Sequence, residues 1–238
     1  MTPSTWPLAV RRAVAVELRQ CRAELDRLRG RAGVRVPVVV AVVASVLAVA
    51  WGNGTVVAGR RLGHDDAVTL VAVPALAAAG LAALRWAGWT WRDLGLGWPS
   101  AEPPRAQPLA WLVAATAVTV GGAVVGLVAG PGATRLAVVR LVLGTAAGEE
   151  VVHRSVLLAL WAATPVGGRA VVAANVVTFG AWHVAAATHA DGLRWWEVAV
   201  PAGTAVLLLW ARLRFRSVLA PVAFHAGGNL PGLVASGS

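Results

Sequence analysis

Three short segments of this 238-residue chain carry side chains that could perform hydrolysis. They are residues 149–154 (EEVVHR), 179–183 (FGAWH) and 225–229 (HAGGN). A carboxylate beside a histidine can act as a general base toward water, and histidine or asparagine can donate hydrogen bonds to developing negative charge. These residue types therefore predict a buried hydrolytic site.

The first segment contains two neighbouring carboxylates that should have different partners. Glu150 and Arg154 are four residues apart, so on a helix they share a face and can form a neutralising ion pair. Glu149 points about 100° away and is left available as a base. The alternative is a charge cluster that only fixes helix packing. His153 is either a hydrogen-bond partner for Glu149 or a spacer, and the sequence leaves both open.

The other two segments repeat a spacing of four residues. Phe179 and His183 share a helical face, so the phenyl ring can pack against the imidazole and restrict its rotamer. His225 and Asn229 are paired in the same way, and the glycines between them allow a close approach. Alone, His183 could be a core histidine, and His225 with Asn229 could form an interhelical hydrogen bond. Three such segments in one chain favour a site.

The elements that carry these residues are expected to lie in a membrane. Hydrophobic residues make up 58% of the chain and charged residues 13%, whereas a soluble domain contains about 25% charged residues. The mean hydropathy is +0.68. A charged side chain at mid-bilayer costs at least ~2.5–3.5 kcal/mol, so buried charges in such a chain face the protein interior and have a function.

The predicted fold is all-α and polytopic, with about seven transmembrane helices, because a span needs ~20 apolar residues. The apolar runs are at about 36–51, 67–86, 109–130, 136–162, 170–187, 194–211 and 217–235. Three regions follow from them: an Arg-rich cytoplasmic arm (1–35), N-terminal transmembrane helices (36–130) and a catalytic core (131–238).

Arginine asymmetry predicts the orientation, because cytoplasmic segments are enriched in positive charge. All 21 basic residues are arginine. With the N-terminus inside, fifteen lie in inner segments, including Arg212, Arg214 and Arg216, and four in outer ones. We therefore expect a multi-pass cell-membrane protein with a cytoplasmic N-terminus. The arginines lie between apolar runs rather than on one face of a soluble module, so we expect no nucleic-acid partner.

Several features outside the three segments have simpler interpretations. The stretch from Trp6 to Arg29 alternates apolar and charged residues at helical spacing, which fits either a surface-lying amphipathic helix or a solvated extension. The single Cys21 is expected to be a free thiol. Residues 64–66 (HDD), His189 and Asp191 are expected in outer loops, and residues 53–55 (NGT) match a glycosylation sequon.

In combination the segments resemble the CPBP family of intramembrane proteases, which includes type II CAAX prenyl endopeptidases and bacterial Abi-type relatives. The family's EExxxR, FxxxH and HxxxN motifs stand in order at 149–154, 179–183 and 225–229. Residues 92–96 (RDLGL) also resemble a short family segment. The resemblance is close over roughly 135–235 and loose before that.

The resemblance implies an all-α membrane fold with a four-helix catalytic core and a CAAX endopeptidase-like activity on a membrane or lipid-modified protein or peptide. It assigns Glu149 and His183 to activation of the attacking water. It assigns His225 and Asn229 to the oxyanion. Supporting roles fall to Glu150, Arg154 and Phe179.

The metal dependence and the function class each have alternatives at this stage. Glu149, His183 and His225 could form a His₂Glu zinc site with an open position, but the chain has no HExxH helix and the same residues can act without a metal. A proton-coupled transporter would also place Glu, His and Arg in the membrane, although no repeated halves are evident. The third possible function is that of a non-catalytic relative of the family that acts as a scaffold or immunity protein.

Overall fold

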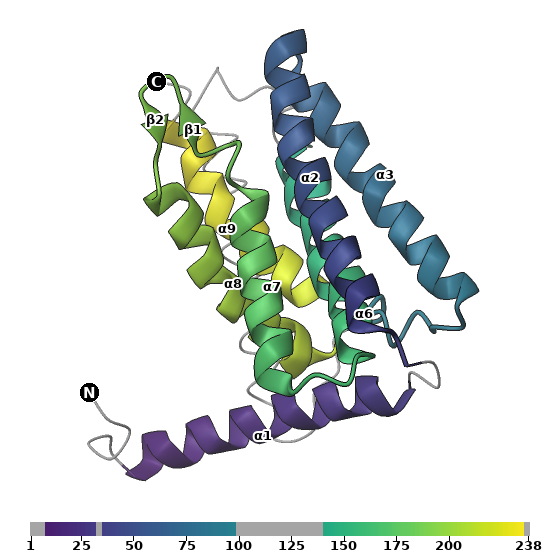
Figure 1. Ribbon diagram of the computed structural model, residues 1–238. Helices are drawn as coiled ribbons and strands as arrows, with labels where there is room; N and C mark the ends of the chain where they lie inside the picture. The colour runs from purple at the N-terminus through teal and green to yellow at the C-terminus, as the bar shows by residue number, and fades with distance from the viewer. Residues whose placement is uncertain (1–7, 32–34, 99–139, 236–238) are drawn as a thin grey trace.

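The computed structural model describes residues 8–31, 35–98 and 140–235, and these residues form a helical bundle (Figure 1). The elements in chain order are α1 (Leu8–Arg31), α2 (Val38–Leu62), α3 (Asp65–Trp86), η2 (Arg140–Gly148), η3 (Val151–Leu157), α6 (Leu158–Ala162), α7 (Gly168–Trp182), β1 (Thr188–His189), β2 (Gly192–Leu193), α8 (Trp196–Phe215) and α9 (Leu219–Ala235). The two strands pair antiparallel in a small hairpin at the end of the bundle opposite α1.

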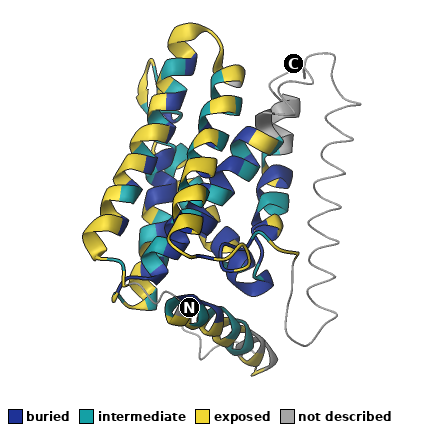
Figure 2. Cartoon of the chain, turned by 90° about the vertical axis from the view of Figure 1, so that its right-hand side faces the viewer, coloured by how far each residue is buried: buried dark blue, intermediate teal, exposed yellow. Residues whose placement is uncertain are grey.

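Three helices in the described ranges are long and apolar enough to cross a membrane: Val38–Leu62, Ala67–Trp86 and Trp196–Phe215. Their outward faces carry apolar side chains, such as Val46 at 60% exposure and Val71 at 69%, and Figure 2 shows exposed residues along the outer sides of the helices. Such surfaces suit lipid rather than water. The all-α membrane class is supported, whereas seven spans and a four-helix core stay predictions. The expected span at 109–130 lies outside the described residues.

Helix α2 is longer than the apolar run that predicts it. The run ends near residue 51, yet the helix continues to Leu62. Asn53 and Thr55 donate hydrogen bonds to the carbonyls of Val49 and Trp51, one turn earlier, at 2.9 and 2.8 Å. Because the donor group of each side chain is bonded within its own helix, it does not require water and the helix continues. Gly63, at φ 67°, then ends the helix in the left-handed conformation.

Residues 8–31 of the N-terminal arm form helix α1, which runs across one end of the bundle, transverse to the other helices (Figure 1). Its inward face buries Leu25, Leu28 and Glu24. Leu8 and Leu18 remain exposed at 57% and 65%. The arm is therefore an amphipathic helix packed on the bundle and not a solvated extension. Burial and the nearby Glu17 carboxylate raise the pKa of the Cys21 thiol to about 11, so Cys21 is a weak nucleophile.

A buried carboxylate holds α1 to the C-terminal helices. Glu24 is fully buried and lies 2.7 Å from Arg27, 3.6 Å from Arg212 and 3.2 Å from Arg216. The hydrogen bond with Glu24 raises the pKa of Arg27, although partial burial opposes this. The expectation that Arg212 and Arg214 follow a span is wrong. Both are buried inside α8, because carboxylates of α1 neutralise them.

The same end of the bundle includes the segment 89–98. Arg27 also pairs with Asp93 at 2.8 Å. Burial opposes ionisation of Asp93, but hydrogen bonds from Thr90 and Arg27 outweigh it and hold the pKa of this carboxyl below its ordinary value. Gly95 adopts φ +75°, and a Cβ there would lie 2.5 Å from the Arg212 guanidinium. The close packing around Arg212 therefore requires glycine.

Replacing Glu24 with glutamine should destabilise the protein strongly. The change removes the negative charge that Arg212 contacts in the interior, and breaking a buried ion pair costs ~3–5 kcal/mol. Asp26→Asn is the matched control, because the Asp26 side chain is 56% exposed and surface pairs contribute ~0–1 kcal/mol. Thermal unfolding of both variants in detergent checks this expectation, and equal loss would contradict it.

Candidate active site

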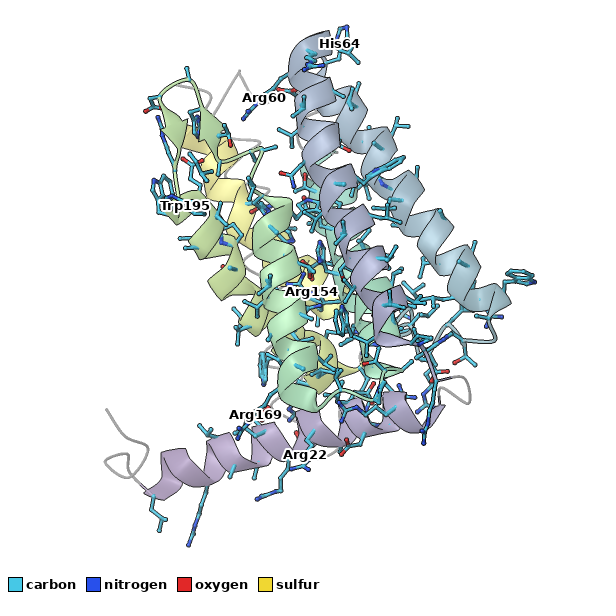
Figure 3. All side chains as sticks on the ribbon, viewed as in Figure 1. Arg22, Arg60, His64, Arg154, Arg169 and Trp195 are labelled. Atoms are coloured by element: carbon cyan, nitrogen blue, oxygen red, sulfur yellow. The ribbon has the colours of Figure 1, made fainter. Side chains whose placement is uncertain are left out.

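At the centre of the bundle lies an ion pair with no access to solvent. Glu150 and Arg154 are both fully buried, and Glu150 Oε2 lies 3.2 Å from Arg154 Nε. The Arg154 guanidinium also lies over the Phe179 ring, 4.1 Å from its centroid. Figure 3 shows Arg154 between the helices. The ion pair expected from the four-residue spacing is thus present, and the phenyl ring of α7 stabilises the cation.

Glu150 also contacts the last helix. Its Oε1 lies 2.8 Å from Nδ1 of His225 in α9. A carboxylate can only accept a hydrogen bond, so His225 donates from Nδ1 and keeps Nε2 for another partner. One buried carboxylate therefore joins Arg154 to His225, which are 71 residues apart in the chain.

His183 stands just after the last turn of α7, where it acts as the C-terminal cap. Its Nδ1 lies 2.8 Å from the Phe179 carbonyl oxygen. Because a carbonyl only accepts, Nδ1 carries the proton and Nε2 is unprotonated in the neutral ring. Nε2 lies 3.7 Å from Oε2 of Glu149, and this buried oxygen has no hydrogen-bond partner. Two acceptors thus face each other.

The Phe179 ring packs against three histidines in edge-on geometry. The ring centroids lie 4.9 Å from His183, 5.0 Å from His153 and 5.8 Å from His225. His153 is completely buried, neither of its ring nitrogens has a hydrogen-bond partner, and it also packs on Trp182. His153 is therefore a packing residue in this structure and not a partner of Glu149.

A cavity of about 460 Å³ opens beside these side chains. All four of the predicted catalytic residues line it: Glu149, His183, His225 and Asn229. The remaining wall is largely apolar, and its residues come mainly from α2, α3, η2, α7, α8 and α9. Glu150 and Arg154 lie fully buried and contact the wall residues His225 and Phe179. The structure thus brings the motif residues of three separate segments to one space.

The backbone that carries the two glutamates is wider than an α-helix. π-Helical turns run from Arg140 to Gly148 and from Val151 to Leu157, and Glu149 and Glu150 stand between them. Such turns leave carbonyls poorly paired within the helix, and they are frequent at functional sites. Arg212 donates from Nε to the Arg154 carbonyl at 3.1 Å. Arg212, which also pairs with Glu24 of α1, therefore supports the helix that carries Arg154.

The fit of a metal ion can be tested on the same groups. The donor types suit zinc, because Nδ1 of each histidine is held by a carbonyl or a carboxylate, as in many zinc sites. However, the described part of the chain contains no group of three His, Cys, Asp or Glu side chains that could hold a metal ion.

Sequence reasoning missed two residues of α2 that hold the backbone around His183. Asn53 donates to the Ala181 carbonyl at 2.9 Å and accepts from the Ala185 amide at 2.5 Å. Arg60 donates to the carbonyls of Ala185, Ala186 and Thr188 at 2.9, 3.1 and 2.9 Å. These bonds connect α2 to the end of α7 and to the turn that follows it.

In the sequence, Asn53 stands out only as part of a glycosylation sequon. A polar residue beside a glycine in an apolar helix can indicate a close helix–helix contact, and this is the signal that the sequence offers for Asn53. A Cβ at Gly52 would lie 2.4 Å from the Trp182 ring, so α2 and α7 pack closely at this level. Two further polar residues do not line the cavity: His189, in strand β1, pairs with Glu197 at 2.8 Å, and Asp191, in the turn that follows, pairs with Arg194 at 3.2 Å.

Replacing Asn53 with leucine should loosen the turn that follows His183. The substitution removes both hydrogen bonds to α7 and its following turn, and a lost buried partner costs ~1–3 kcal/mol, or roughly tenfold in local opening. Hydrogen exchange of residues 183–188 measures this. Thr55→Val is the control, because the Thr55 hydroxyl bonds only within α2. Unchanged exchange in Asn53→Leu would contradict the assignment.

Comparison with known proteins agrees with the motifs. Residues 131–231 match the sequence model of a family described as type II CAAX prenyl endopeptidase Rce1-like. The matched range contains all three motif segments, and the match confirms the predicted family resemblance for this part of the chain. No curated protein and no solved structure matches the chain.

Proposed function

We propose that this protein is an intramembrane endopeptidase that hydrolyses a peptide bond of a membrane or lipid-modified protein with water activated by Glu149 and His183. The observation that carries the proposal is the pair of acceptors, Glu149 Oε2 and His183 Nε2, 3.7 Å apart at the wall of a cavity. The family match supports a peptidase with a protein substrate in the membrane.

The two acceptors are suited to hold a water molecule. A water that donates one hydrogen to Glu149 Oε2 and the other to His183 Nε2 satisfies both atoms, whose separation of 3.7 Å is too long for a direct hydrogen bond. One acceptor takes a proton as the water oxygen attacks the carbonyl carbon of the scissile bond. The carbonyl π bond breaks, and its electron pair moves to the oxygen as an oxyanion.

His225 and Asn229 are the proposed donors to that oxyanion. Both residues line the cavity that contains Glu149 and His183. Because Nδ1 of His225 donates to Glu150, Nε2 can donate only when the ring is protonated, and the Glu150 carboxylate is the charge that stabilises this form. A donor of this kind contributes ~2.7–4 kcal/mol in comparable sites.

Collapse of the tetrahedral intermediate completes the reaction. The C–N bond breaks, the oxyanion becomes a carbonyl again, and the proton taken from water passes to the leaving amine. Glu149 and His183 are thereby restored. The cavity of about 460 Å³ with a largely apolar wall accommodates a few residues of an apolar or lipid-modified chain.

The two glutamates should differ in their effect when each becomes glutamine. Glu149→Gln removes the proton acceptor but keeps the shape, so cleavage should fall by at least a hundredfold with folding nearly unchanged. Glu150→Gln leaves Arg154 buried without its counter-charge and should destabilise the protein by ~3–5 kcal/mol. Thermal unfolding measures the loss of stability. Membrane proteomics, in which each variant is compared with the wild type, measures the loss of cleavage as accumulation of uncut substrate. Equal activity and equal stability would show that the roles are wrongly assigned.

Metal dependence has a direct test in the purified protein. Activity that depends on the side chains alone should be indifferent to a chelator. A zinc enzyme would instead lose activity with the chelator and regain it with zinc. A peptide library supplied to protein in liposomes measures both. If no peptide is cut and Glu149-dependent proton or solute flux appears, a transporter replaces the protease.

A further inference from the structure

Helices α2 and α7 lie side by side (Figure 1). Residues of both helices line a surface groove. The groove has a volume of about 570 Å³. It is lined by small apolar side chains from both helices together with Trp161, Ser45 and Thr178. Val46 and Val177, at its mouth, are 60% and 66% exposed. The groove is therefore apolar along its length and open at the surface.

The groove lies at the depth of the lipid tails. Helix α2 is one of the helices long enough to span a membrane, and it begins at Val38. The groove residues of α2 run from Val42 to Ala50, which places them roughly 6–18 Å along the helix from its start at 1.5 Å per residue. An occupant at this depth has to be apolar, since water is excluded there, and an acyl chain meets this requirement.

A second cavity lies at the beginning of both helices, next to α1. It measures about 430 Å³ and is lined by Arg29, Arg35 and the turn 162–167. Arg29 donates from Nη2 to the Val166 carbonyl at 2.7 Å, whereas its buried Nε has no hydrogen-bond partner. Arg35 is exposed. Asp26 opposes them in part, because it lies 3.5 Å from Nη1 of Arg29.

We propose that these two cavities bind one anionic phospholipid, with an acyl chain in the α2–α7 groove and the phosphate between Arg29 and Arg35. The cavity with the arginines lies beside amphipathic helix α1, at the level where spans end and headgroups begin. Two arginines outweigh one aspartate, and basic residues at this level attract anionic lipids. The pairing of an apolar groove with a cationic end matches a lipid and not a soluble anion.

The lipid site is independent of the proposed peptidase activity. It uses none of the residues that line the catalytic cavity. A bound lipid would nevertheless brace α2 against α7, and α2 holds the backbone around His183 through Asn53.

Native mass spectrometry of the purified full-length protein tests this proposal with added phosphatidylglycerol or phosphatidylcholine. The wild type should retain phosphatidylglycerol in preference. Arg35→Gln and Arg29→Gln should each weaken that binding about fivefold, since a basic residue near the surface contributes ~1 kcal/mol. Arg61→Gln, at the other end of α2, is the charge control and should leave binding unchanged. Arg35→Gln keeps the test sound if Arg29→Gln does not fold, because Arg35 is exposed.

The acyl-chain half of the site needs its own variant. Ala173 lines the groove and is exposed, so Ala173→Leu should narrow the groove and reduce lipid retention without changing charge. Ala170→Leu, an exposed α7 position outside the groove lining, is its control. Equal retention of the two lipids, or no effect of Arg35→Gln or of Ala173→Leu, would overturn the proposal. Displacement of the lipid by inorganic phosphate alone would instead identify a free-anion site.

Discussion

Burying the guanidinium of Arg154 in a membrane protein sets the arrangement of the helices around it. An isolated charge in this environment is costly, so its partners must come from within the bundle. Glu150 supplies the counter-charge from the same helix, and the Phe179 ring of α7 covers the cation at 4.1 Å. The second oxygen of Glu150 then accepts from His225 of α9. The Arg154–Glu150 pair thus connects its own helix to α7 and α9.

In this arrangement the two adjacent carboxylates, Glu149 and Glu150, have different contacts. Glu150 forms an ion pair with Arg154 through Oε2 and accepts a hydrogen bond from His225 through Oε1. Glu149, one residue earlier, lines the cavity and has an oxygen with no hydrogen-bond partner. Because a buried carboxylate oxygen without a partner is unfavourable, Glu149 is poised to bind a hydrogen donor such as water. Glu150 is thus held in an ion pair with Arg154, whereas Glu149 can still accept a hydrogen bond.

The parts of the chain before residue 99 support the site from both ends. At one end, Glu24 of α1 contacts Arg212, which in turn donates to the Arg154 carbonyl. At the other end, Asn53 and Arg60 of α2 bond to the backbone just before and after His183. These segments lie outside the range that matches the protease family. Their contacts connect the residues around the cavity to both ends of the bundle.

The sequence alone determined the membrane class, the amphipathic arm as one of two options, and the residues that could do chemistry. These properties are local, since they depend on hydropathy and on spacings of four residues such as Glu150 to Arg154. Only the tertiary structure decided which groups meet. His225 bonds to Glu150 across 75 residues, and Asn53 reaches Ala185 across 132. No periodicity in the chain encodes such contacts. The burial of Arg212 could not be seen either, because its neutralising carboxylate comes from α1 at the other end of the sequence.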